Sequence, residues 1–214
     1  MSDPVKRHYA SALRAQQARA TRRGVVEAAR DLFVRKGWTA TSVEHVAAAA
    51  GVSRATVFTV GGKAELLKLA YDTAIGGDDE DVAMADRPAM RELAAAPDLD
   101  TLIVRYVELV VATGTRVAGI YVALRAAAAD ADERVRALFA DVQAQRLVGA
   151  SGFVSTLAER GGLRSGLDQE MAADVLWTLL DPGLYAALVQ DRGWPSERFA
   201  AWWERTLRAQ LLAP

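Results

Sequence analysis

The sequence predicts an all-α fold, on three observations. Ala, Leu, Val and Arg are abundant while residues typical of strands are few, which favours helices. Apolar residues recur at three- and four-residue spacing through most of the chain. Glycines, prolines and capping residues separate these stretches and give the helices defined ends. The 214 residues are enough for one large or two modest domains with a buried core.

Composition excludes several classes of function. Without cysteine there are no disulfides, thiolate nucleophiles or zinc–thiolate sites, and His8 and His45 are the only histidines. Gly61-Gly62-Lys63 is no phosphate loop, because Val57 and Ala64 stand where Gly and Ser or Thr are required. We therefore expect no enzyme, no metal and no cofactor. The N-terminus lacks the apolar core of a secretory signal, and no apolar run approaches the roughly 20 residues of a membrane helix, so a cytoplasmic protein without membrane contact is expected.

The first predicted helix runs from about Ser11 or Arg14 to Lys36, and Gly37 ends it. Its buried stripe consists of apolar residues at helical spacing: Val25, Ala28, Ala29, Leu32 and Phe33. Arg22 and Arg23 near its exposed face are candidate phosphate contacts. The residues before it, including Pro4, are expected to be loose. The basic side chains of this segment and of the start of the helix form either an arm along DNA or a solvated tail: Lys6, Arg7, Arg14 and Arg19.

The segment Thr41–Val60, TSVEHVAAAAGVSRATVFTV, predicts a helix-turn-helix. Thr41 followed by Glu44 is the pattern of a capping box, which begins a helix ended by Gly51. Ser53 is a new N-cap, and the second helix runs from Arg54 to about Val60. A second helix of this kind fits the major groove of DNA.

The second helix has outward side chains suited to DNA. Arg54, Thr56 and Thr59 can hydrogen-bond bases or phosphates, and the small Ala55 permits close approach and a methyl–methyl contact with thymine. The alternative is a two-helix corner inside an all-α core whose polar residues are simply solvated. The distribution of charge favours DNA binding over this alternative. Residues 1–75 carry 12 Lys and Arg against 6 Asp and Glu, whereas the rest of the chain carries 14 against 21.

The helical pattern continues to the C-terminus. Lys63 to Ile75 is predicted as a fourth helix with Leu66, Leu67, Ala70 and Tyr71 inward, and the acidic, glycine-rich stretch 76–86 marks a boundary or surface loop. Further helices are predicted at 88–93, from Pro97 to a break near Gly114, from Thr115 or Arg116 to Ala129, at 132–160 as the longest, at 168–190 with a kink at Pro182-Gly183, and at 195–212.

Polar residues interrupt the apolar stripes of this second part and suggest a ligand pocket. Arg146 and an Asp are predicted to hold a ligand against aromatic side chains, the full candidate set being Tyr106, Tyr121, Arg146, Phe153, Asp174, Trp177 and Asp181. The alternative is a satisfied internal ion pair or an edge residue that reaches water.

The last two helices are richer in large apolar residues than one core face requires, which predicts a homodimer interface of Leu176, Leu180, Leu184, Leu188, Phe199, Trp202 and Trp203. The alternative is packing within the subunit, which must hold for at least one of the adjacent tryptophans. Two subunits would present two recognition helices about 34 Å apart to one duplex.

The segment TRRGVVEAARDLFVRKGWTATSVEHVAAAAGVSRATVF resembles the N-terminal domain of TetR-type transcriptional repressors. The matching positions are Arg22, Ala29, Phe33, Gly37, Thr41, Ser42, Val46, Ala47, Gly51, Val52, Ser53, Thr56, Lys63 and Leu66. The resemblance implies an arm at 1–20, a three-helix DNA-binding domain at 21–67 and an antiparallel helical bundle for ligand binding and dimerisation at 68–214. It also implies a homodimer joined by a four-helix bundle, double-stranded DNA with a palindromic operator as partner, and an unidentified small-molecule effector that releases it.

The resemblance places the DNA contacts at Arg22, Arg23, Thr41, Ser42, Ser53, Arg54, Ala55, Thr56, Phe58, Thr59 and Lys63. The family commonly has Tyr at position 58 and one more residue before the Lys, whereas this chain has Phe58 and the paired glycines Gly61-Gly62. Phe58 cannot offer a hydroxyl to a phosphate. The alternatives are therefore an all-α dimeric ligand- or protein-binding module whose DNA contacts have decayed, and an architectural DNA binder without an effector.

Overall fold

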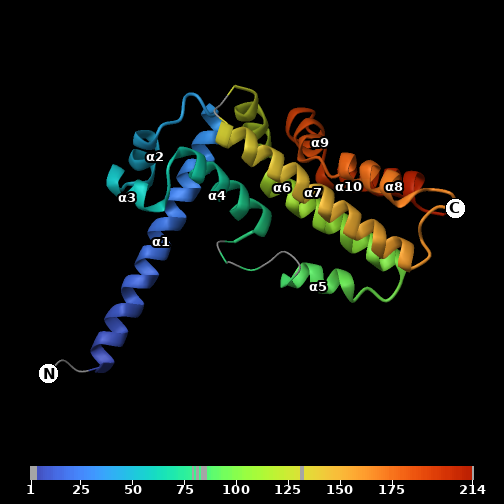
Figure 1. The fold of residues 1–214 in the computed structure, drawn as a ribbon, viewed down its shortest axis with the longest axis horizontal. Coiled ribbons are helices and arrows are strands. Elements are labelled where there is room, and N and C mark those ends of the chain that lie inside the picture. Colours follow the sequence, from blue (N-terminus) through green and yellow to red (C-terminus); the bar gives the residue numbers. More distant parts are fainter. Residues whose placement is uncertain (1–3, 79, 81, 83–85, 131–132, 214) are drawn as a thin grey trace. The chain divides into compact units, whose positions relative to one another are not determined.

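The structure, a computed structural model, describes residues 4–78, 80, 82, 86–130 and 133–213. Within them every regular element is a helix, and the only strand-like pairing is an isolated bridge between Leu163 and Leu212. The predicted all-α class is confirmed (Figure 1). The chain divides into two compact units, Met1–Thr73 and Ala74–Pro214.

The N-terminal unit is built on α1 (Pro4–Lys36), α2 (Val43–Ala50), α3 (Arg54–Val60) and the first part of α4 (Lys63–Gly76). Its core contains the predicted apolar residues except Ala28, which is only partly buried, together with a few additions: Val25, Val26, Ala29, Leu32, Phe33, Val46, Ala47, Val57, Leu66, Leu67, Ala70 and Tyr71. Trp38 stacks on Phe33 with ring centroids 5.8 Å apart and so covers this core. Gly37 ends α1 with φ of 75°, a conformation that costs glycine little.

The first helix begins earlier than the sequence predicts. We expected a loose start, but α1 begins at Pro4, because proline is favoured in the first turn of a helix, where its missing N–H has no intrahelical partner. Within α1, Leu13 to Ala20 are exposed. The side chains of Lys6 and Arg7 lie outside the described part of the chain.

The cap of α2 is Ser42, not Thr41. The Ser42 hydroxyl accepts from the amide of His45 at 3.3 Å, whereas the Thr41 hydroxyl donates to the carbonyl of Gly37 at 2.8 Å and is 1% exposed. The predicted capping box is therefore wrong: with Ser42 as the cap, the N3 position is His45 and not Glu44. Gly51 ends α2 in the left-handed conformation with φ of 66°, and Ser53 caps α3 by accepting from the amide of Thr56 at 3.0 Å, both as predicted.

The C-terminal unit contains α5 (Pro88–Ala94), α6 (Leu99–Asp130), α7 (Glu133–Glu159), α8 (Gln169–Leu179), α9 (Pro182–Tyr185), the π-helix η2 (Ala186–Asp191) and α10 (Ser196–Leu211). Figure 1 shows α6 and α7 running side by side, with α8 and α10 along them. The predicted helix 168–190 is wrong as one kinked helix. It stops at Leu179, and Asp181 caps α9 by accepting from the amide of Gly183 at 2.6 Å.

The predicted break at Gly114 is also wrong, because α6 is continuous for 32 residues and is longer than the 27-residue α7. The glycine serves a close approach instead. A Cβ at position 114 would lie 2.7 Å from Cδ2 of Tyr185, so the tyrosine ring rests on the bare backbone of α6. The Tyr185 hydroxyl lies 2.8 Å from the hydroxyl of Thr115 and 3.0 Å from that of Ser196, which ties α9 to α6 and α10.

Arginines from neighbouring elements satisfy the carbonyls at helix ends in the C-terminal unit. Arg116 donates to the carbonyls of Ala74 and Ile75 at 3.0 and 3.4 Å, and Arg87 donates to that of Gly76 at 2.7 Å. These three carbonyls are the last of α4. Arg160 likewise donates to the carbonyls of Ala94, the last residue of α5, and of Ala96 just after it. Cations at these ends also oppose the negative end of the helix dipole.

Two helical stretches, Leu99–Ala129 and Gln169–Asp191, are long and apolar enough to cross a membrane by length and composition alone. The expectation that no segment reaches this threshold is therefore wrong. Both stretches supply the core of the C-terminal unit, with side chains such as Ile103, Leu124 and Leu176 fully buried. Core helices of soluble proteins pass the same test.

Candidate nucleic-acid interface

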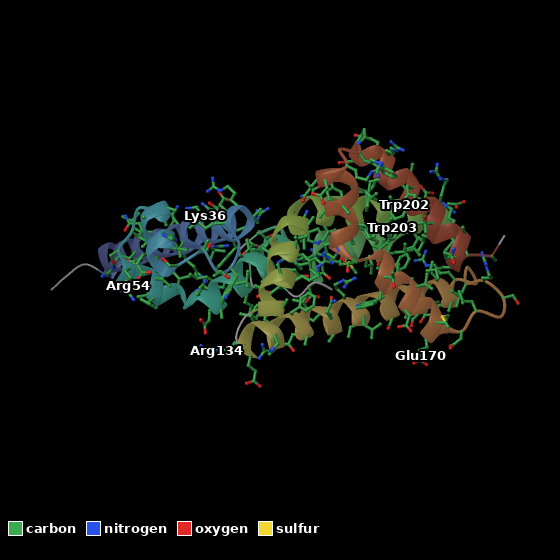
Figure 2. All side chains as sticks on the ribbon, turned by 90° about the horizontal axis from the view of Figure 1, so that it is seen from above. Lys36, Arg54, Arg134, Glu170, Trp202 and Trp203 are labelled. Carbon is green, nitrogen blue, oxygen red and sulfur yellow. The ribbon has the colours of Figure 1, made fainter. Side chains whose placement is uncertain are left out.

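The outer face of α3 carries the candidate base-reading residues. Val57 is fully buried and anchors the helix, while Arg54, Ala55 and Thr59 are exposed and Phe58 is 51% exposed. Figure 2 shows Arg54 at the edge of the N-terminal unit. The face predicted to point outward therefore does so, on a helix held by a cap at each end.

The threonine hydroxyls of α3 are already engaged within the helix. Thr56 Oγ1 lies 2.8 Å from the Ser53 hydroxyl, and the Thr59 hydroxyl donates to the carbonyl of Thr56 at 2.7 Å. Their oxygens keep lone pairs that can accept, so each suits a donor such as the amino group of adenine or cytosine better than a phosphate. Ser53, which is exposed, uses its hydroxyl mainly as the cap.

Arg54 is the only cation of α3 and is held by two neighbours. Its Nε lies 2.9 Å from Oε1 of Glu44 on α2, and its guanidinium lies 5.4 Å from the centroid of the Phe58 ring. The amide of Glu44 itself and the Ser42 hydroxyl, with further attraction from Arg54, lower the pKa of Glu44. The carboxylate is therefore ionised at neutral pH.

The start of α4 offers Lys63 beside an aromatic ring. Lys63 Nζ lies 4.2 Å from the centroid of Trp38, and burial lowers the pKa of Lys63. Gly61 and Gly62 leave room for Glu65, because a Cβ on Gly61 would lie 2.8 Å from Cβ of Glu65. The paired glycines are thus explained by packing within the turn.

The other predicted DNA contacts divide into exposed and buried residues. Arg22 and Arg23 are exposed on α1, and Ser42 is half-buried at the start of α2. Thr41 is a correction: its side chain is buried and bonded to Gly37, so it has no surface to offer DNA. His45, whose side chain is expected from the sequence to be solvated or to face a phosphate, is exposed, and its Nδ1 lies 3.1 Å from the carbonyl of Ala40. A carbonyl only accepts, so Nδ1 carries the proton and Nε2 remains for another partner.

The predicted ligand pocket is not one site in the structure. Tyr106 and Phe153 stack with centroids 3.6 Å apart inside the core, where burial raises the pKa of Tyr106, and Asp174 is exposed on α8. The remaining four residues do meet. They are Tyr121, Arg146, Trp177 and Asp181.

Arg146 is the centre of this polar cluster and is nearly buried. Its Nη groups donate to Oε1 of Gln143 at 2.5 Å and to the carbonyl of Trp177 at 2.6 Å, and Asp181 lies 3.9 Å away. The Tyr121 hydroxyl donates to Asp181 at 3.1 Å, and burial is the main cause that raises the pKa of Tyr121. The contacts are those of an internal polar network, with Nε of Arg146 left unpaired among the described residues.

A cavity of about 450 Å³ lies elsewhere in the C-terminal unit, at the end of α4. Its lining is Ile75, Gly76, Gly77, Asp78, Arg87, Pro88, Ala89, Met90, Glu92, Arg105, Glu108, Leu109, Ala112, Thr113 and Arg116. The volume is in the range of small-molecule sites. Arg87 and Arg116 both line it and hold the last carbonyls of α4, which the sequence could not indicate because 40 residues separate Gly76 from Arg116.

Three of the predicted dimer residues are withdrawn into the core of their own unit. Leu176, Phe199 and Trp203 are at most 2% exposed, and the Trp203 indole donates to the carbonyl of Leu179 at 2.8 Å. Leu180, Leu184, Leu188 and Trp202 keep part of their surface. Figure 2 shows Trp202 and Trp203 on the C-terminal helix. Of the adjacent tryptophans, Trp203 is the one that packs internally.

Three large apolar side chains on α7 and α8 are exposed to solvent. Val148 is 73% exposed, Met171 56% and Leu147 40%. They lie beside a shallow groove between the two helices, lined by Leu147, Ser151, Ser155, Gln169, Glu170, Ala173 and Asp174. The sequence does not indicate this exposed apolar surface, because its large residues stand singly among small ones and interrupt the apolar stripe of the helix.

Among the described residues no cluster of three His, Asp or Glu side chains could hold a metal ion. The geometry thus gives a capped helix-turn-helix with Arg54 exposed on its outer face, in a chain whose second unit is a helical bundle.

Comparisons with known proteins agree with this arrangement. Residues 25–68 match the family model described as bacterial regulatory proteins, tetR family. No curated protein matches the chain. NalD, the secondary repressor of the MexAB-OprM multidrug efflux pump in Pseudomonas aeruginosa, has 22% identity and a TM-score of 0.67 over 92% of this chain and 97% of its own.

Two proteins named FadR have the same fold. The fatty acid degradation regulator FadR from Bacillus halodurans has 17% identity and a TM-score of 0.69 over 89% of this chain and 95% of its own. FadR from Bacillus subtilis, solved with stearoyl-CoA, has 15% identity and a TM-score of 0.67 over 87% and 97%. Residues 25–68 are thus a TetR-family N-terminal domain, and the chain as a whole has the fold of TetR-type regulators, which confirms the resemblance. The family is one of regulators rather than enzymes.

Proposed function

We propose that the protein is a cytoplasmic, homodimeric transcriptional repressor that binds a palindromic operator and is released by a small molecule. The observation that carries the proposal is the outer face of α3, where Arg54, Ala55 and Phe58 are exposed on a helix fixed by Ser53 and Val57. A short, rigid helix with one bidentate donor and a small residue is suited to base edges in the major groove.

Backbone contacts surround this face. Donors come from Arg22 and Arg23 on α1, from Ser42 at the start of α2 and from Lys63 at the start of α4. The N-terminal amides of α4 add a site for a phosphate. His45 lies beside them, and its Nε2 is the ring nitrogen that is left for another partner.

The proposed dimer face is the outer surface of α7 and α8, because Leu176, Phe199 and Trp203 of the expected set are buried in their own unit. Val148, Met171 and Leu147 are the most exposed large apolar residues of this unit's last helices, and small residues between them permit close helix contact. A twofold axis here would make one interface of the same patch on both subunits.

The proposed effector site is the cavity at the end of α4. α4 contains the boundary between the two units, at Thr73 and Ala74, and its last carbonyls are held by arginines that also line the cavity. A ligand that engages Arg87 or Arg116 competes with those carbonyls and alters the end of α4. It shifts DNA affinity only if it binds the two conformations with different affinity.

In vitro selection from random duplexes, followed by binding measurements at several salt concentrations, tests the proposal. We expect a palindromic consensus, a steep salt dependence and one dimer per site. A compound screen for release then tests the effector. If no consensus emerges and binding to duplex DNA stays weak at low salt, the DNA-binding function is wrong and a module with decayed DNA contacts is the better account.

A further inference from the structure

The ion pair between Arg54 and Glu44 joins the two helices of the helix-turn-helix on their outer side. The 2.9 Å contact runs from the first residue of α3 to the first turn of α2. The side chains are 63% and 56% exposed, so the pair faces solvent rather than the core. An exposed pair of this kind adds little to stability. Its effect is on where the guanidinium points.

The pair fixes which edge of the guanidinium faces outward. Its closest contact uses Nε, on the inner side of the group, and the Phe58 ring lies against one face at 5.4 Å. The outer edge formed by Nη1 and Nη2 is the one that remains for a ligand. That edge donates two parallel hydrogen bonds, which match O6 and N7 of guanine in the major groove.

The carboxylate that holds Arg54 is itself fixed. The amide of Glu44 and the Ser42 hydroxyl lower the pKa of Glu44, and the Ser42 hydroxyl accepts from the amide of His45 at 3.3 Å. The carboxylate also lies at the N-terminus of α2, where the helix dipole favours a negative charge. Glu44 therefore remains charged and in place at neutral pH.

A free arginine at this position would bind any phosphate within reach of its long side chain. Glu44 opposes that, because its charge repels phosphates and offsets the charge of Arg54. A base edge gives no such repulsion, since guanine presents neutral acceptors.

We propose that Glu44 is a positioning residue that holds Arg54 for a guanine in the operator and withholds it from phosphates. The inference rests on the proposed DNA-binding function and adds the base that is read and the residue that sets discrimination. A bidentate arginine–guanine contact discriminates against other bases by ~10-fold or more. Without Glu44 most of that preference is lost and binding to random DNA becomes tighter.

The test compares Glu44→Gln with Glu65→Gln. Both remove one exposed negative charge from a first helical turn of the same unit, and Glu65 has no contact with Arg54. Dissociation constants are measured for the consensus selected by the wild type, for duplexes with each guanine replaced, and for random duplex, at several salt concentrations.

Glu44→Gln should bind random DNA more tightly, steepen the salt slope by about one per subunit, and lower the preference for one guanine per half-site by ~10-fold. Glu65→Gln should keep the guanine preference. Arg54→Lys keeps the charge but cannot donate a planar pair of bonds, so it should lose preference at the same guanine. Circular dichroism melting checks that each variant is folded.

The outcomes separate the inference from the function on which it rests. If the wild type selects no sequence, the proposed function fails. If the wild type selects a consensus and Glu44→Gln keeps every base preference, or if Arg54→Lys changes a base that Glu44→Gln does not, the positioning role is overturned. Should Glu44→Gln prove unfolded, the Arg54→Lys variant still decides whether a guanine is read here.

Discussion

At the scale of single residues, the sequence pattern could not decide whether Thr41 or Ser42 caps α2. Thr41 and Ser42 are both good caps, and the Thr41–Glu44 spacing favours the first. Folding decides for Ser42, because the Thr41 methyl and hydroxyl are taken into the joint with Gly37. The same choice removes Thr41 from the DNA-facing surface.

Replacing the cap should lower stability in a way that depends on its oxygen. Ser42→Ala should cost about 1 kcal/mol in the free energy of unfolding, because the amide of His45 loses its acceptor. Ser42→Asp should stay within about 0.5 kcal/mol of the wild type, since aspartate caps equally well. Urea unfolding measures both. An equal loss in the two variants would show that Ser42 contributes through something other than capping.

Arg54 and Lys63 should affect DNA binding differently. Arg54→Ala should change which bases are preferred, whereas Lys63→Ala should weaken binding to all sequences and flatten the salt slope by about one. Titrations of selected and random duplexes in a salt series measure this. Equal loss of affinity on every sequence in both variants would contradict the division between base and backbone contacts.

At the scale of elements, the N-terminal helices follow from the sequence and the C-terminal ones only partly. The ends of α2, α3 and α4 coincide with Gly51, Ser53 and Lys63, because caps and left-handed glycines are local signals. At Gly114, by contrast, the local signal led to a wrong prediction. A glycine within an apolar stretch suggests a break, but its cause is the ring of Tyr185, which is 71 positions further along the chain. No local pattern contains that information.

Gly114 should therefore be hard to replace although it lies within a helix. Gly114→Ala should lower the free energy of unfolding by about 1–3 kcal/mol, because the added Cβ meets the Tyr185 ring. Gly149→Ala on α7 is the matched control: a Cβ there meets nothing within 4 Å, and alanine favours the helix by up to about 1 kcal/mol. Thermal unfolding compares the two. A gain in stability for Gly114→Ala would show that α6 and α9 separate easily.

At the scale of the whole molecule, the candidate sites were harder to predict than the class. Helical period, charge division and the capped turn indicate an all-α regulator from the sequence alone. The register of the long helices decides which side chains of the second unit meet, and the sequence does not show that register. The residues predicted to form one pocket therefore lie in three places: a stacked pair in the core, an exposed Asp174 and one polar cluster. Apolar residues of the last helices divided in the same way between core and surface.

The proposed dimer face can be tested by charge. Val148→Asp should dissociate the dimer and weaken binding to the full palindrome more than to a half-site, because a buried carboxylate at an interface is costly. Val104→Asp is the control, since Val104 is exposed on α6, outside that face. Analytical ultracentrifugation measures the mass. If the Val148→Asp variant stays dimeric, the proposed face is wrong, and the interface is better assigned to the partly exposed Leu184, Leu188 and Trp202.

One consequence concerns Trp38, which lies under Lys63 and is the only one of the five tryptophans before residue 74. A phosphate that draws Lys63 Nζ away from the indole changes the electronic surroundings of that ring. Fluorine placed on the indoles gives each tryptophan its own magnetic resonance signal, and the one altered in Lys63→Ala is assigned to Trp38. Following that signal during a titration with duplex DNA observes the backbone contact directly, in the unmutated protein.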